Sequence, residues 1–313
     1  MNHKLFSSFI VHCPFFIIHF SLFIFHCSFF IVHFYLLPLH SMKITALVEN
    51  TSRTGIPTEH GLSLYIECKD GRNILFDMGQ GTLFAENAIC LGLSVTDVDL
   101  AIVSHGHYDH GGGLRTFLKK NNKANVYIHK DAFLPHYSMR EGEIHYIGLD
   151  KDLEDNPRLI ICDGKTMIDD STILLSDIKG DICYPPGNNR LLGPTKNVHD
   201  NFCHEQNLVL HEDGKTMLFA GCAHRGIANI LRSVTEVIGT VPDYVFSGMH
   251  LMKNGLSKQE EDIFIHHLAD ELAQYPGCTF FTMHCTGTDL FLRLKDIMGT
   301  QMNYLSCGEK VSI

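Results

Sequence analysis

The chain has 313 residues, 45% of them hydrophobic, which is enough for one large α/β domain with a substantial core. Its formal net charge of −10 at pH 7, without clusters of Lys or Arg, argues against nucleic acid as the main substrate. The eleven cysteines are an odd number without short paired spacings. They predict reduced thiols in the cytoplasm rather than a disulfide framework.

Residues 1–41 form a segment of different composition, hydrophobic and low in complexity. They contain one Lys and no Arg, Asp or Glu, so residues 42–313 carry a formal charge of −11. A histidine recurs every seven residues, at His12, His19, His26, His33 and His40. We favour translation of repetitive DNA upstream of a true start at Met42. A membrane anchor through residues 5–37 and a metal-binding histidine tract are the alternatives.

Residues 42–313 alternate between strands and helices and predict a single domain. The first half predicts strands over 43–48, 62–68, 73–77, 99–103 and 126–129, and helices over 82–92 and 112–120. The second half predicts strands over 208–211, 216–220, 244–247 and 279–283, and helices over 226–237, 257–274 and 289–297. Strand pairs alternating with single helices in both halves predict two sheets packed face to face and covered by helices. Residues 131–206 have less pattern and are interpreted as an inserted lid or a substrate-facing region.

The helix expected over 257–274 has clear end signals. Ser257 and Glu260 form a capping box at its start, and Pro276-Gly277 stops it. We expect Ile263, Leu268 and Leu272 to face the core.

Residues 104–113 are the most informative run of the chain. Three imidazoles and a carboxylate follow the predicted strand 99–103 within a few residues, and they belong to His105, His107, Asp109 and His110. Histidines at positions i and i+2 beyond a strand end can point the same way, and the next turn carries Asp109 and His110 to a second point nearby. Imidazole and carboxylate suit zinc, iron or manganese. The run predicts two adjacent metal ions, and a loop that is His-rich by chance is the alternative.

This HxHxDH run resembles a motif of the metallo-β-lactamase superfamily. Residues 75–79, in which Asp77 ends an early strand, residues 218–226 and residues 282–287 resemble further motifs of that superfamily. Residues 59–63, 221–226, 248–251 and 284–287 together resemble one subgroup, which includes the ribofuranosyl-aminobenzene phosphate (dihydropterin) synthase of methanopterin biosynthesis. The resemblance covers roughly residues 42–313 and implies an α/β fold, the four-layer αβ/βα sandwich.

The remaining metal ligands are expected at two other strand ends. His284 follows an apolar strand, and Cys222 and His224 again lie at i and i+2. Most members of the superfamily place a bridging Asp where this chain has Cys222, so the thiolate is expected to bind one metal, to bridge both, or to leave the position to His224. We assign His105, His107 and His224 to the first metal and Asp109, His110 and His284 to the second, with Cys222 between them.

Other residues are expected around the ligands rather than among them. Asp77 is expected to accept a hydrogen bond from a ligating histidine. The resemblance makes Glu59, His60 and His250 candidates for the pocket wall. His199 and His204 are interpreted as ordinary surface histidines, and His136 and His129 also as ordinary.

The cluster predicts a metallo-hydrolase with two divalent metal ions, with Zn²⁺ favoured and Fe or Mn as alternatives. Two adjacent cations lower the pKa of a shared water and polarise the bond under attack. We expect hydrolysis of an ester-type bond of a small-molecule substrate, with a phosphodiester favoured and with Asp109 and His110 essential. A transferase of the dihydropterin synthase type and a non-catalytic metal-binding protein are the alternatives. A membrane is a partner only if residues 1–41 form an anchor.

Overall fold

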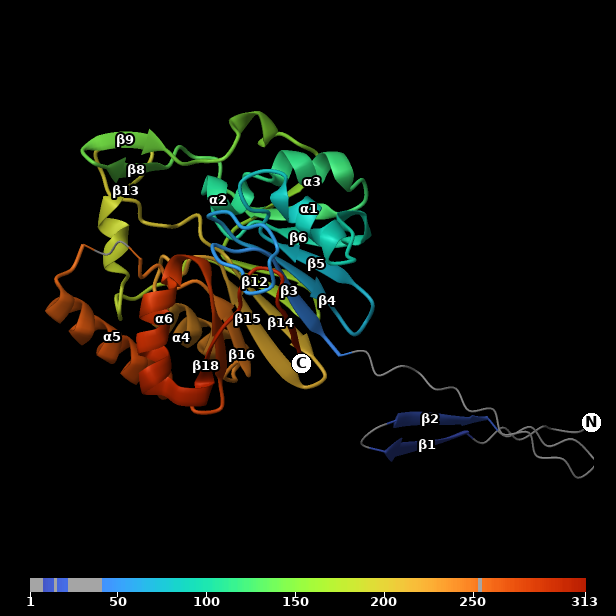
Figure 1. The fold of residues 1–313 in the computed structure, drawn as a ribbon. Helices are drawn as coiled ribbons and strands as arrows, with labels where there is room; N and C mark the ends of the chain where they lie inside the picture. The colour runs from blue at the N-terminus through green and yellow to red at the C-terminus, as the bar shows by residue number, and fades with distance from the viewer. Residues whose placement is uncertain (1–7, 14–15, 22–40, 253–254) are drawn as a thin grey trace, which may run out of the picture. The chain divides into compact units, whose positions relative to one another are not determined.

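The computed structural model describes residues 8–13, 16–21, 41–252 and 255–313 (Figure 1). The chain divides into two units, Met1–Ser41 and Met42–Ile313. In the first unit, β1 (Ser8–Cys13) pairs antiparallel with β2 (Phe16–Ser21). The interpretations offered for residues 1–41 fall largely outside the described residues. Among the residues that are described, no helix has the length and apolar character needed to span a membrane.

The second unit is built on two seven-stranded sheets. The first has the order β10-β7-β6-β5-β4-β3-β19, with strands β3 (Lys43–Val48), β4 (Ser63–Glu67), β5 (Asn73–Phe76), β6 (Leu100–Ile102), β7 (Asn125–His129), β10 (Leu159–Cys162) and β19 (Lys310–Ser312). The second has the order β11-β12-β14-β15-β16-β17-β18, with strands β11 (Lys165–Asp169), β12 (Thr172–Leu175), β14 (Asn207–Glu212), β15 (Lys215–Ala220), β16 (Tyr244–Ser247), β17 (Thr279–Thr282) and β18 (Met302–Tyr304). Each sheet is antiparallel in one half and parallel in the other, along β5-β6-β7-β10 and β15-β16-β17-β18.

Three apolar clusters separate four layers of structure. One lies between the sheets, where Phe76 of the first sheet meets Phe219 of the second with ring centroids 6.0 Å apart. A second packs the first sheet against α1 (Leu83–Cys90) and α3 (Leu114–Lys120). The third packs the second sheet against α4 (Ile227–Ile238), α5 (Lys258–Ala273) and α6 (Thr288–Met298). The expected αβ/βα sandwich is confirmed.

The short helices occupy turns at the edges of these layers. They are α2 (Tyr108–Gly111), η1 (Val95–Asp97), η2 (Lys151–Leu153), η3 (Pro186–Arg190), η4 (His284–Thr286) and η5 (Gly299–Gln301).

The helix from Ser257 confirms its predicted ends but not its predicted face. The capping box of Ser257 and Glu260 is present. Ile263, however, is 64% exposed, whereas Ile265 is buried with Leu268 and Leu272. Residues 265, 268 and 272 follow the i, i+3, i+7 spacing of one helix face, and residue 263 lies on the other side. The expectation for Ile263 was wrong.

The interpretation of residues 131–206 as an inserted lid is only partly correct. β10, β11 and β12 from this region join the two main sheets as short strands. A separate small sheet remains, in which β8 (Tyr137–Arg140) pairs with β9 (Glu143–Tyr146) and β13 (Leu191–Leu192). This small sheet lies beyond the parallel strand ends in Figure 1.

Candidate metal centre

The predicted site residues come together where the parallel strands of both sheets end. Asp77 follows β5, His105 to His110 follow β6, Cys222 and His224 follow β15, His250 follows β16 and His284 follows β17. The carboxyl ends of neighbouring parallel strands lie at one edge of a sheet, so residues distant in sequence converge there.

Tight turns at these strand ends aim the side chains. Asp77, Ala223, His250 and His284 all have positive φ, between 48° and 61°. Such angles are uncommon for residues with a Cβ and cluster where a fold imposes a functional geometry. At Gly221 a Cβ would collide with Ser104 of the other sheet, which shows how closely the two sheets approach here.

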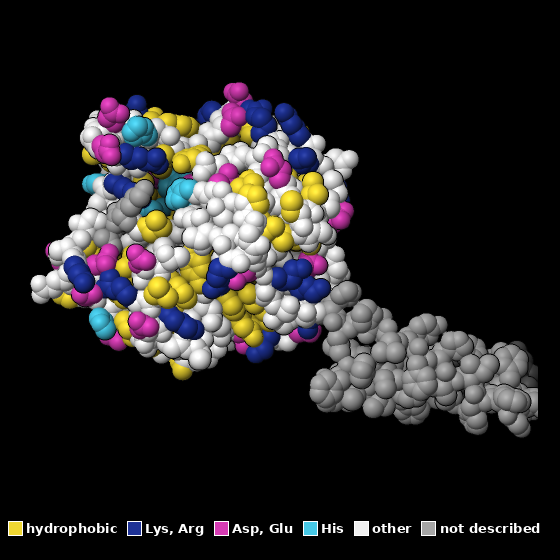
Figure 2. Space-filling view, viewed as in Figure 1, with side chains coloured by type: hydrophobic (Ala, Val, Ile, Leu, Met, Phe, Trp, Pro, Cys, Tyr) yellow, Lys and Arg dark blue, Asp and Glu magenta, His cyan; other side chains and the backbone are white. Residues whose placement is uncertain are grey.

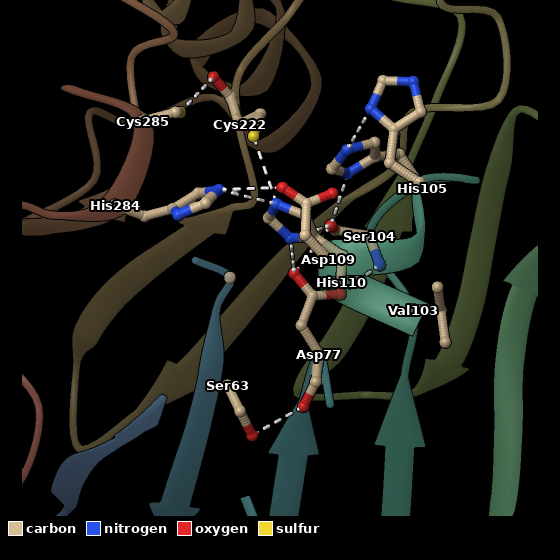
Figure 3. A network of polar contacts seen from close by, with 12 residues as sticks. Ser63, Asp77, Val103, Ser104, His105, Asp109, His110, Cys222, His284 and Cys285 are labelled. Atoms are coloured by element: carbon tan, nitrogen blue, oxygen red, sulfur yellow. Dashed lines mark hydrogen bonds and ion pairs between the residues drawn. The ribbon is translucent and has the colours of Figure 1, made fainter. Parts of the chain in front are cut away.

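Seven residues each have a donor atom within 4.8 Å of donor atoms on at least two other His, Cys or Asp side chains, and we call them the metal set: His105, His107, Asp109, His110, Cys222, His224 and His284. Figure 3 labels five of them, His105, Asp109, His110, Cys222 and His284. The Nε2 atom of His105 lies 3.0 Å from Nδ1 of His107. Donor atoms of both lie within 4.8 Å of one on His224.

A second group of donors lies beside the first. Nε2 of His110 is 3.1 Å from Sγ of Cys222 and 3.3 Å from Nε2 of His284. An oxygen of Asp109 is 3.4 Å from the same atom of His284. Cys222 lies between the two groups, because its thiol is within 4.8 Å of donor atoms on both His105 and His110.

The outer nitrogens of four of these imidazoles are held by hydrogen bonds. The Nδ1 group of His110 donates to Asp77 over 2.7 Å, and that of His105 contacts the Ser104 hydroxyl over 2.9 Å. The corresponding groups of His224 and His284 contact Asn188 Oδ1 over 2.9 Å and Asn50 Oδ1 over 2.8 Å. Metal-ligating histidines in proteins are oriented by such bonds to the nitrogen that does not bind the metal.

The electrostatics of the metal set also fit cations. Burial lowers the pKa values of His105, His107 and His224, which keeps these imidazoles neutral, the form that binds metals. The Nε2 atom of His224 is buried and has no hydrogen-bond partner among the described residues. Burial raises the pKa of Asp109, but hydrogen bonds from His284 and His60 outweigh it and hold the net pKa well below the usual value. Asp109 thus adds a buried carboxylate to the neutral imidazoles of His105, His107 and His224, and divalent cations bind donors of both kinds.

His110 differs because it faces a buried carboxylate. Burial alone lowers its pKa, but the charge and hydrogen bond of Asp77 outweigh burial and raise it to about 9. Asp77 also accepts from the backbone N–H and the hydroxyl of Ser104, each over 2.7 Å. All of these contacts lie on the outer side of His110, so Asp77 orients the imidazole from behind.

The three candidate wall residues have different positions. The Nε2 atom of His60 lies 3.2 Å from Asp109, and its half-exposed ring lines the pocket over the metal set. His250 is buried in the same pocket, its ring 4.2 Å from that of His224, and its two nitrogens have no partner among the described residues. Glu59 instead accepts from the Gln80 N–H over 2.9 Å and is not among the lining residues.

The backbone of His284 is also held by a residue that follows β3. Glu49, directly after β3, accepts from the backbone N–H of His284 over 2.8 Å and from the Tyr304 hydroxyl over 2.6 Å. Glu205 has a similar role for His224, whose N–H it accepts over 2.6 Å, and burial raises the pKa of Glu205 to about 7. Neither glutamate has a motif that sequence reasoning could have used.

The interpretation of His204 as a surface histidine was wrong. His204 is 1% exposed, and its Nδ1 atom accepts from the Gly106 N–H over 2.9 Å. Its Nε2 group lies 3.3 Å from Asp200, which also bonds Nδ1 of His136 over 2.9 Å. We call His136, Asp200 and His204 the carboxylate cluster. It lies beside His107, and the polar neighbours of His204 in the sequence gave no signal for its burial.

Comparisons with known proteins agree with this geometry. The family model described as the metallo-beta-lactamase superfamily matches residues 56–248. An uncharacterized protein of Methanocaldococcus jannaschii is 29% identical over 263 residues, covering 81% of this chain and 94% of its own. A second protein of that organism, 7,8-dihydropterin-6-methyl-4-(beta-D-ribofuranosyl)-aminobenzene-5'-phosphate synthase, is 26% identical over 274 residues, covering 79% of this chain and 88% of its own.

A solved structure gives the same result for the fold. It is described as a metal-dependent hydrolase of the beta-lactamase superfamily and has a TM-score of 0.67 at 28% sequence identity, covering 87% of this chain and 99% of its own. With the family model matching more than half of the residues, the chain belongs to the metallo-beta-lactamase superfamily.

Proposed function

We propose that this protein is a metal-dependent hydrolase of an ester-type bond, with a phosphodiester as the favoured substrate class. The observation that carries the proposal is the paired arrangement of the metal set. Each half offers three donor residues, and the outer nitrogens of His105, His110, His224 and His284 are already bonded. The solved structure of a metal-dependent hydrolase at 28% identity supports the same reaction class.

The metal set suits two divalent cations, with His105, His107 and His224 at one and Asp109, His110 and His284 at the other. Five imidazoles with one carboxylate and one thiol favour zinc, and iron or manganese are the alternatives. Bound there, the cations would supply a shared water of lowered pKa and polarise the scissile bond.

The protein's own residues position the reactants. Asp109 is fixed between His60 and His284, so its carboxylate has one orientation towards the pocket. Asp77 holds the imidazole of His110, which would otherwise rotate. His250 presents two ring nitrogens without partners among the described residues to the same pocket, where they can hydrogen-bond the substrate.

The test is the behaviour of His110→Ala in protein expressed from Met42. We expect hydrolysis of bis(p-nitrophenyl) phosphate or of a cyclic nucleotide by the metal-loaded protein and its loss in the variant, with an unchanged circular dichroism spectrum. His199→Ala is the matched control, because His199 is exposed and outside the metal set. Loss of activity only through unfolding would remove the catalytic role of His110.

The two-metal arrangement has its own measurement. Elemental analysis should give about two equivalents of metal in the unmutated protein and about one in Asp109→Ala. A reproducible single equivalent in the unmutated protein would rule out the binuclear centre.

A transferase is the second candidate, favoured by the relative named as a dihydropterin synthase. Turnover would then require an amine acceptor together with a pterin diphosphate. Steady hydrolysis without an acceptor would exclude it. A non-catalytic metal-binding role is less compatible with the site, since closed structural zinc sites are usually Cys-rich tetrahedra.

A further inference from the structure

Two arginines line the pocket over the metal set. Arg140 is the last residue of β8, and Arg190 is the last residue of η3. Both belong to the lining together with Asp109, Cys222 and His224. Figure 2 shows Lys and Arg side chains beside the histidines around a hollow on this face.

The fold brings these arginines to the metal set by two connections. Asn188, two residues before Arg190, bonds both the carbonyl and the Nδ1 group of His224. β13, which starts directly after Arg190, pairs with β8 so that Leu191 lies opposite Ser138, two residues before Arg140. Arg190 is thus two residues from a side chain that bonds His224, and strand pairing connects β8, which ends at Arg140, to the strand that follows Arg190.

Neither guanidinium has an anionic partner among the described residues. Every other arginine of the chain contacts a carboxylate or a backbone carbonyl, for example Arg72 with Asp169 and Arg158 with the carbonyl of Leu118. Arg190 is half-buried, and its Nε atom is buried without a hydrogen-bond partner. Leaving a charged donor in this state is costly, and a bound anion would remove the cost.

The charged groups around Arg190 also favour the binding of an anion beside it. Burial lowers the pKa of Arg190, and repulsion from Arg140 lowers it further. Cys285, Asp109 and Cys222 act in the opposite direction, which places Arg190 within electrostatic range of the metal set. An anion between the two guanidiniums would cancel their repulsion.

We propose that Arg140 and Arg190 form an anion-binding subsite that holds a phosphate group of the substrate beside the metal set. Guanidinium groups bind phosphate through two parallel hydrogen bonds. A terminal phosphate group carries close to two negative charges at pH 7 and matches two arginines, whereas a carboxylate or a phosphodiester carries one. The group held here is therefore a terminal phosphate beside the bond that is cleaved. The inference rests on the proposed function, because it names the substrate class of the same pocket.

The experiment measures binding without turnover in the metal-loaded, full-length protein. Phenylphosphonate, a non-hydrolysable mimic of a phosphate monoester, is titrated by calorimetry into the unmutated protein, Arg140→Gln, Arg190→Gln and the double variant. We expect the dissociation constant to rise about tenfold in each single variant and more in the double one, as for loss of a charge-assisted bond. Lys196→Gln is the matched control, because Lys196 stacks on Tyr137 nearby and does not line the pocket.

Two results would overturn the subsite. A change of less than twofold in both single variants would mean that the cations alone hold the anion. Binding of benzoate as tight as that of phenylphosphonate, with the same dependence on arginine, would make the ligand a carboxylate. Hydrolysis of p-nitrophenyl acetate is measured in parallel, and we expect the control Lys196→Gln to retain it. Binding that depends on arginine in a protein without any hydrolytic activity would refute the proposed function and leave the subsite intact.

Discussion

The protein buries histidines in two neighbouring groups, the carboxylate cluster and the metal set, which differ in the partners of their ring nitrogens. In the carboxylate cluster, Asp200 lies between His136 and His204 and accepts from both rings. In the metal set, inner nitrogens face each other or a thiol, as in the 3.3 Å approach of His110 to His284. In the carboxylate cluster three of the four ring nitrogens have a partner, and Nε2 of His136 has none among the described residues. The metal set instead turns nitrogens, a thiol and a carboxylate towards one another.

The difference shows what separates a supporting histidine from a ligand in this fold. Both kinds are buried, and both have lowered pKa values because of burial, as in His204, whose pKa falls to about 4, and His105. Burial and pKa therefore do not distinguish them. What distinguishes them is the partner of the ring nitrogen that faces the rest of its group. This difference can be tested by substituting residues of each group separately.

Removal of the metals should have the largest effect. A ligand whose free concentration is about 1,000 times its dissociation constant stabilises the folded state by about 4 kcal/mol. Adding a chelator to metal-loaded protein should lower the free energy of unfolding by about that much per site, measured by urea denaturation. An unchanged midpoint would mean that the metal set is satisfied without cations.

Asp200→Asn should come next. The substitution removes the carboxylate that two buried rings share, and we expect a loss of about 2–3 kcal/mol in the free energy of unfolding. Metal content should stay at two equivalents, because the hydrogen bonds of the Asp200 side chain go to His136, His204 and the backbone of Phe202, although a donor atom of His107 lies within 4.8 Å of this cluster. Loss of a metal equivalent in this variant would show that the two groups are one site.

Asp77→Asn tests the outer bonds of the metal set. Asp77 is the partner of His110 Nδ1, and loss of such a partner typically weakens metal affinity by about 10–100-fold. Competition with a chromophoric chelator would measure the change. Asn73→Asp in the same strand provides a control for charge changes at a distance, since Asn73 contacts the Asp97 carbonyl away from the pocket.

The smallest expected energetic effect belongs to Cys222, although its spectroscopic signature is sharp. If the thiolate binds a metal, Cys222→Asp should retain both metals and shift the preference towards harder ions. Cobalt-substituted protein should show thiolate-to-metal charge transfer that disappears in the variant. A cobalt spectrum and metal content that are unchanged in Cys222→Ala would make Cys222 a buried bystander.

The parts of the protein that could be predicted from sequence have local signals. The HxHxDH run lies within six residues, and the hairpins and capping box depend on neighbouring residues. The strand ends then placed His224 and His284 by the same rule as His105. The strands and helices that were correctly expected have an apolar periodicity within them and turn residues at their ends.

The parts that were missed depend on contacts between distant residues. Asn188 and Asn50 hold ligands from 36 and 234 residues away, and asparagines are common in loops. His204 has polar neighbours in sequence, and only the packing of both sheets buries it beside Asp200. The strands of residues 131–206 are two to five residues long, too short for their periodicity to separate them from loops.

The contact between the imidazoles of His110 and His284 has a consequence for the order of folding. These residues are 174 positions apart, and closing a loop of that length in an unfolded chain costs on the order of 5 kcal/mol in chain entropy. A cation cannot recover that cost from one shared pair of ligands while the chain is open. The two sheets must pack first, with Glu49 at the start of the domain fixing the backbone of His284 near its end. If the metal set binds cations, we expect loading to follow the packing of the two sheets, and a nascent chain that ends before β17 lacks His284 and cannot complete it.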